Sequence, residues 1–139
     1  MNHSYLKEEK EYLNSFINTT LDLSKFHHNE HLLITYTLLV DKDIEQTYQF
    51  IKDGILNILK KAKVDSSKYH VTMTYGWILI IKYFMKKTKK CKSFKEFISL
   101  NSQLLNTNIL YLHYSKNLLD SNESKIKILN PDIQDINIY

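Results

Sequence analysis

Apolar side chains recur every three or four positions between residues 44 and 62, and this is the clearest amphipathic pattern in the chain. The positions are Ile44, Tyr48, Ile51, Ile55, Ile58 and Leu59. Asp43 stands immediately before this run and is a suitable N-cap residue. The pattern predicts an amphipathic helix that ends near Ala62, with its lysines facing water.

Similar patterns predict further helices over 5–17, 28–40 and 69–87. Ser93 and Glu96 have the spacing of a capping box, which starts a short helix that runs to about Leu100. Another helix is predicted over 109–119, and a last turn or two within 121–128. Two glycines and one proline leave few residues for the tight turns of a strand-rich fold. We therefore predict an all-α, single-domain helical bundle of five or six helices.

The 139 residues fit one domain, 1–139. Within it we expect an N-terminal helix and loop (1–25), a histidine-bearing bundle (26–128) and an irregular tail (129–139). The longest apolar run is interrupted by Lys82 and is far shorter than the roughly 20 residues of a membrane span. Charged residues within 7–11 break any signal-peptide core, and the single cysteine, Cys91, cannot form an internal disulfide. These features predict a soluble, cytoplasmic protein without a membrane partner.

All nineteen basic residues are lysines, and the densest cluster lies in 86–92. Arginine, whose planar group binds phosphates and bases in a bidentate manner, is absent from the chain. No basic stripe with interleaved aromatic residues is present either. The cluster is better explained as a solvated helix end, where positive charge suits the helix dipole. We therefore expect no nucleic-acid partner.

Three histidines occur within residues 27–31, at the start of the second predicted helix. At 100° per residue, His28, His31 and Thr35 share one helix face. His70 occupies the matching place at the start of the predicted helix 69–87. These two helices are alternate members of the bundle and should run parallel, so we predict that their starts meet over one polar pocket. His27 lies off the shared face, and no sequence pattern places His3 in the predicted pocket.

Four segments resemble a family of small bacterial proteins whose function is uncharacterised. The segments are 26–32 (FHHNEHL), 69–74 (YHVTMT), 114–119 (YSKNLL) and 130–132 (NPD). The family has an aromatic-x-H-x-x-H-L element, followed by Y-H-E-T-x-T, Y-S-R-E-x-L and E-P-D elements in the same order. The resemblance implies a shared polar site but does not indicate which reaction, if any, takes place there.

The resemblance implies seven matching polar residues in that site. They are His28, His31, His70, Thr72, Thr74, Tyr114 and Ser115. Two positions depart from the family pattern, because Val71 replaces a glutamate and Lys116 replaces an arginine. If that glutamate were a general base, this chain would lack it. Lys116 retains the positive charge but not the two-point grip of arginine.

Two site hypotheses follow. His28, His31 and His70 could bind a divalent transition metal through neutral imidazoles, with water or substrate in the open position. Alternatively, the same residues could act without metal as catalytic acid and base, or as hydrogen-bond donors to a small polar or anionic ligand. In that case Lys116 would supply the countercharge. Tyr114, Ser115, Thr72 and Thr74 would orient the ligand.

The competing interpretation makes these histidines structural, hydrogen-bonded to hydroxyls and helix-end carbonyls. In that case the chain would be a non-catalytic binding or regulatory module whose apolar helix faces recognise a protein partner. The primary functional prediction is a histidine-lined pocket that binds, and could transform, a small polar or anionic molecule.

Overall fold

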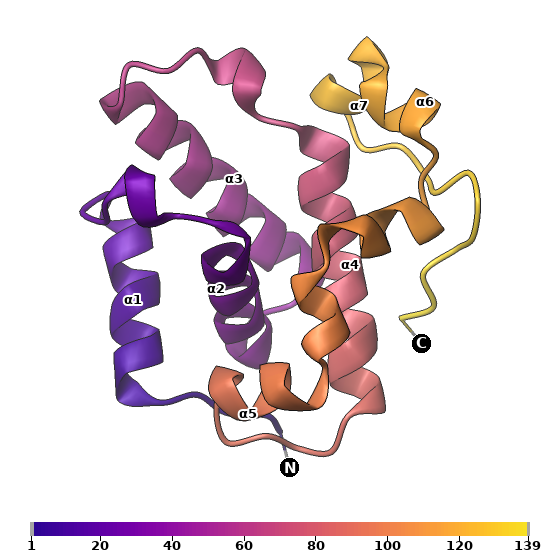
Figure 1. Ribbon diagram of the computed structural model, residues 1–139. Coiled ribbons are helices and arrows are strands. Elements are labelled where there is room, and N and C mark those ends of the chain that lie inside the picture. Colours follow the sequence, from indigo (N-terminus) through magenta and orange to yellow (C-terminus); the bar gives the residue numbers. More distant parts are fainter. Residues whose placement is uncertain (1, 139) are drawn as a thin grey trace.

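The computed structural model describes residues 2–138, and every regular element in that range is a helix (Figure 1). The longer helices are α1 (Lys7–Ile17), α2 (His28–Asp41), α3 (Ile44–Lys61), α4 (Val71–Lys87) and α5 (Phe94–Leu100). Shorter elements are α6 (Lys116–Asp120), α7 (Asn122–Ile126) and the 3-10 helices η1 (Leu23–Lys25), η2 (Ser66–Lys68), η3 (Ser102–Leu105) and η4 (Thr107–Leu112). The predicted all-α fold, built on five main helices in one body, is confirmed.

Helix α2 is the central helix, because it contacts α1, α3, α4 and α5. Its sequence is apolar around much of its circumference, as expected for a helix enclosed by neighbours. Leu32, Ile34, Tyr36 and Leu38 are each at most 2% exposed. In Figure 1, α2 lies between α1 and α4.

Helices α1 to α4 alternate in direction, so α2 and α4 run the same way and begin at the same end of the molecule (Figure 1). Short connections favour this up-and-down order. The loop between α2 and α3 is only Lys42–Asp43. As a result, the histidine-bearing start of α2 and the start of α4 lie at one end, which agrees with the predicted topology.

Local caps set the starts of α3 and α5 where the sequence predicted them. Asp43 Oδ1 accepts a hydrogen bond from Gln46 N at 2.7 Å. Ser93 Oγ accepts one from Glu96 N at 3.0 Å. Each bond satisfies a backbone N–H that has no partner within the helix.

The prediction of one continuous helix over 109–119 is wrong. The chain forms η4, turns at 113–115 and starts α6 at Lys116. Ser115 is extended, with φ −69° and ψ 155°, and its hydroxyl caps α6 by accepting from Leu118 N. The Asp132 carboxylate accepts from Ser115 N at 2.7 Å, and Ile133 N donates to His113 O at 3.0 Å. The C-terminal tail therefore forms hydrogen bonds with Ser115 N and His113 O, two groups that a continuous helix would pair internally.

The segment before α1 is tied to the far end of α4 by His3, which is 7% exposed. His3 Nε2 donates to Met85 O at 2.7 Å, and Nδ1 accepts from Cys91 N at 3.0 Å. Nearby, the buried Glu9 carboxylate accepts from Phe94 N at 3.0 Å, at the first turn of α5. These contacts close the end of the bundle opposite the starts of α2 and α4.

Candidate functional site

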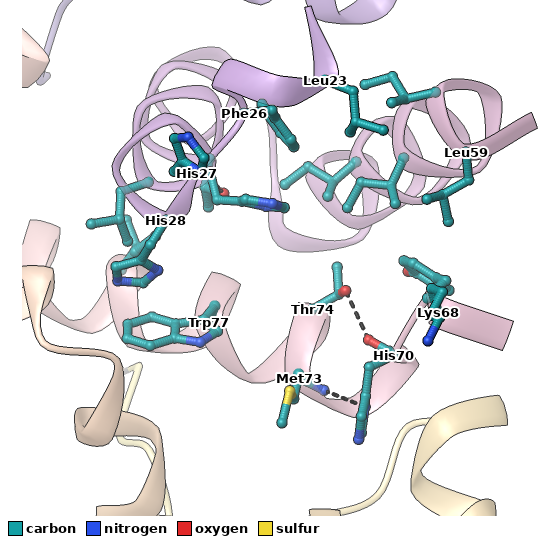
Figure 2. A pocket seen from close by; sticks show the side chains of 18 residues that line it. Leu23, Phe26, His27, His28, Leu59, Lys68, His70, Met73, Thr74 and Trp77 are labelled. Atoms are coloured by element: carbon teal, nitrogen blue, oxygen red, sulfur yellow. Dashed lines mark hydrogen bonds between the residues drawn. The ribbon is translucent and has the colours of Figure 1, made fainter. Parts of the chain in front are cut away.

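A cavity of about 440 Å³ lies between α2, α3 and α4, beside the segments that contain η1 and η2 (Figure 2). Most of its wall is apolar: Leu23, Phe26, Leu32, Ile51, Ile55, Ile58, Leu59, Met73, Trp77 and Ile81. The remaining lining residues are His27, His28, His31, Thr35, Lys68, Tyr69, His70 and Thr74. No aspartate or glutamate belongs to this lining.

His28, the first residue of α2, has its ring fixed by two contacts. Its Nε2 lies 2.8 Å from Leu104 O. Because a carbonyl only accepts, Nε2 carries the proton and Nδ1 is an acceptor. The ring also packs edge-on against Trp77, with 4.7 Å between ring centroids. His28 thus links α2 to η3 and α4.

His70 directly precedes α4, and both of its ring nitrogens are occupied by backbone groups. Nδ1 accepts from Met73 N at 3.2 Å, which caps the helix. Nε2 donates to Leu119 O at 2.8 Å, which joins α4 to α6. In Figure 2 the ring lies far from those of His28 and Trp77 and does not point toward them. The imidazole is therefore a structural link, although the residue borders the cavity.

His31 lies one turn further along α2, and no hydrogen bond of its ring is found among residues 2–138. Its nearest ring neighbour is Phe26, with 4.2 Å between centroids. Burial, reinforced by the proximity of His28 and opposed by Glu30, lowers the pKa of His31 from 6.5 to about 4. The ring is consequently neutral near pH 7, and it offers one unused donor and one unused acceptor.

Tyr69 supplies a second polar group without a partner. The residue is 8% exposed, and its buried hydroxyl makes no hydrogen bond within normal distance and angle limits. Burial raises its pKa, and the hydroxyls of Thr74 and Tyr48 lie close enough to act on it. The phenol therefore stays protonated near neutral pH and can donate a hydrogen bond.

Within residues 2–138, no three histidine, cysteine, aspartate or glutamate side chains are grouped so that they could hold a metal ion. In the predicted set of His28, His31 and His70, two rings are directed to backbone carbonyls of separate segments. The predicted tri-histidine metal site is not supported by this arrangement.

Four residues that the sequence assigned to the site lie outside the cavity lining. Thr72 Oγ1 donates to Lys127 O at 2.7 Å and holds the chain after α7. Ser115 caps α6, and the exposed Lys116 pairs with Asp120 at 2.9 Å. Tyr114 is buried against α4, where its ring meets Gly76. Thr72, Tyr114 and Ser115 thus contact or cap the C-terminal segments, whereas the ion pair of Lys116 stays within α6.

Thr74 is the one predicted hydroxyl residue that does line the cavity, and its Oγ1 donates to His70 O at 2.8 Å. Sequence reasoning missed Tyr69 and Lys68 as site residues. Tyr69 belonged to a quoted motif, but nothing in the sequence indicated that its hydroxyl would be buried without a partner.

Comparison with known protein families, with curated proteins and with solved structures found no match. The family resemblance drawn from the sequence motifs therefore stays a prediction. Among residues 2–138, no helix has both the length and the apolar character needed to cross a lipid bilayer.

Proposed function

We propose that this is a cytoplasmic small-molecule-binding protein and that the cavity between α2, α3 and α4 is its ligand site. The observation that carries the proposal is a cavity of about 440 Å³ into whose lining His31 and Tyr69 bring polar groups without protein partners. Ligand pockets commonly measure about 300–1,000 Å³ and combine apolar walls with a few polar groups. The apolar wall implies a ligand with a larger apolar part than the sequence alone suggested.

Binding is favoured over catalysis by the state of the histidines. Both ring nitrogens of His70 are hydrogen-bonded, so this residue cannot exchange a proton with a ligand without losing a helix contact. The ring of His31 makes no hydrogen bond within residues 2–138, but a group with a pKa of about 4 is a weak general base near pH 7. We assign His31 to ligand contact.

A neutral apolar probe tests the cavity separately from any question of charge. Methyl NMR spectra of isoleucine-labelled protein would be recorded with and without toluene. Ile51, Ile55, Ile58 and Ile81 line the cavity, whereas Ile126 and Ile133 are exposed elsewhere. We expect toluene to shift the first group of methyl signals and not the second.

Ile55→Trp would fill the cavity, and Ile98→Trp on α5 is the matched control because Ile98 is also only partly buried. The toluene shifts should vanish in Ile55→Trp and persist in Ile98→Trp, with circular dichroism confirming that both variants fold. Wild-type protein without toluene shifts would refute the proposed site. That result would favour the alternative of a helix surface that recognises a protein partner.

A further inference from the structure

The charges around the cavity indicate which ligands it can accept. Lys68 is the one lysine in the lining, and no carboxylate is present there. Glu30 and Asp53 act on the pKa values of His31 and Tyr69 respectively, but neither lines the cavity. Glu30 is already engaged, since its Oε1 accepts from His27 N at 2.9 Å. A cationic ligand would therefore enter without a counterion, whereas an anion would meet Lys68.

The unused hydrogen-bonding groups point to the same kind of ligand. Tyr69 is more than nine-tenths buried, and its protonated hydroxyl makes no hydrogen bond of normal geometry, although the hydroxyls of Tyr48 and Thr74 lie near it. His31 has a ring N–H without a partner. The buried hydroxyl of Tyr69 is unfavourable when left unsatisfied, and an acceptor supplied by a ligand removes that cost. The partly buried ring of His31 offers a second donor to the same ligand. A carboxylate has two oxygens that accept hydrogen bonds and no donor when ionised.

From the cavity, its wall and these groups together, we propose that the ligand is a monocarboxylate with an apolar body. Its carboxylate accepts hydrogen bonds from His31 and Tyr69, and Lys68 balances its charge. Its body occupies the apolar wall formed by α3 and α4. This inference rests on the proposed ligand site and adds the chemical class of the ligand.

Binding of this class is coupled to a proton. A carboxylate beside His31 favours the charged imidazole and raises the pKa of His31 above its free value of about 4. The other titratable groups around the ring are His27 before α2, His28 and Glu30 on α2, Lys68 and Tyr69 before α4, and His70 at its start. The part of α3 in the wall supplies none. Proton uptake on octanoate binding that is lost in His31→Phe therefore reports on His31.

Calorimetric titration of the intact protein near neutral pH tests the ligand class with four probes. Octanoate, 1-octanol and octylammonium share one apolar chain and differ in the polar end, and acetate retains the carboxylate without the chain. We expect octanoate to bind about tenfold or more tightly than 1-octanol, as two hydrogen bonds to a charged group imply. Octylammonium and acetate should show no measurable binding. Octanoate titrations in two buffers of different ionisation enthalpy should reveal proton uptake.

Two variants identify the contacts. Tyr69→Phe removes only the unpartnered hydroxyl, and Lys68→Gln removes only the charge. Each should weaken octanoate binding about fivefold to tenfold. The effect on 1-octanol should be smaller for Tyr69→Phe, because an alcohol is a weaker acceptor than a carboxylate, and absent for Lys68→Gln, because an alcohol carries no charge. Tyr111→Phe and Lys116→Gln are matched controls on exposed residues outside the cavity, and they should bind octanoate like the wild type.

The outcomes separate this inference from the proposed site. If 1-octanol binds as tightly as octanoate and Tyr69→Phe changes neither, the carboxylate assignment is overturned while the cavity remains a ligand site. A preference for octylammonium overturns the assignment as well. If no probe binds and toluene shifts no cavity methyl signal, both proposals fall.

Discussion

His70 offers the sharpest test of the division between structural and ligand-binding histidines. Replacement by alanine removes the acceptor for Met73 N and the donor to Leu119 O. Loss of an N-cap costs about 0.5–2 kcal/mol, and the 3.2 Å distance to Met73 N favours the lower half of that range. Loss of the second bond costs about 1 kcal/mol. Leu119 O keeps a share of the Ser124 hydroxyl, which lies 3.1 Å from it and 2.8 Å from Ser121 O. We expect His70→Ala to lower the free energy of unfolding by about 2 kcal/mol.

Urea unfolding followed by circular dichroism measures this change. His70→Asn retains a short side-chain acceptor for Met73 N but cannot reach Leu119 O, so it should recover about 1 kcal/mol. His27→Ala is the matched control, because His27 holds the same position before α2 and its exposed ring makes no capping hydrogen bond. Its effect should stay within about 0.5 kcal/mol.

Equal destabilisation by His70→Ala and His27→Ala would refute the structural role of His70. The structural role would also be refuted if the His70→Ala protein kept its stability but no longer bound octanoate. In that case the ring would be a ligand contact, as the sequence motif suggested.

Three further perturbations test other parts of the structure. His31 has a pKa of about 4 when folded and about 6.5 when unfolded, so its contribution of about 3 kcal/mol is present above pH 6.5 and lost as the pH falls toward 4. Urea unfolding across this range should show a steeper loss in the wild type than in His31→Phe. Glu9→Gln should lower the free energy of unfolding by about 2 kcal/mol in thermal melts, because its amide oxygen can serve Phe94 N while its amide N–H would face the donor Lys95 N. Gly54→Ala would place a Cβ 2.3 Å from the Phe16 ring, and overpacking of about 1–3 kcal/mol should exceed the helix-propensity gain of about 1 kcal/mol. Urea unfolding should detect a net loss that the double variant with Phe16→Leu largely reverses.

Elements whose ends depend on nearby residues could be predicted from the sequence. Asp43 and Ser93 cap helices through N–H groups three residues away, so the starts of α3 and α5 are local properties. The apolar spacing over 44–62 likewise predicted the buried Ile51 and Ile58 of α3, but it missed Thr47 and Gly54, which are also buried. The break before α6 depends on Asp132, which lies 17 residues beyond Ser115. A window around 109–119 contains the Ser115 cap of α6 but not the Asp132 contact that holds Ser115.

The same difference between local and long-range contacts explains why the sequence assigned no role to His3 and Glu9. His3 contacts Met85 and Cys91, which are 82 and 88 residues away, and Glu9 reaches the start of α5 across 85 residues. In the sequence, His3 is an isolated polar residue near the chain start, and Glu9 is one of several charges on α1. Only the folded arrangement shows that both side chains satisfy buried backbone groups.

The spacing of the histidines predicted which of them border one end of the bundle, but it could not predict which ring nitrogens remain free. A residue just before a helix lies beside backbone N–H groups that lack helical partners, so the position that made His70 conspicuous also makes its ring a cap. His28 is bonded to a carbonyl of η3, a segment 76 residues away. His31 lies one turn into α2, where the backbone N–H groups already have partners within the helix, and its ring faces Phe26 instead. Position at the helix start therefore accounts for the structural role of His70, a long-range contact accounts for that of His28, and the ring of His31 is the one left available to a ligand.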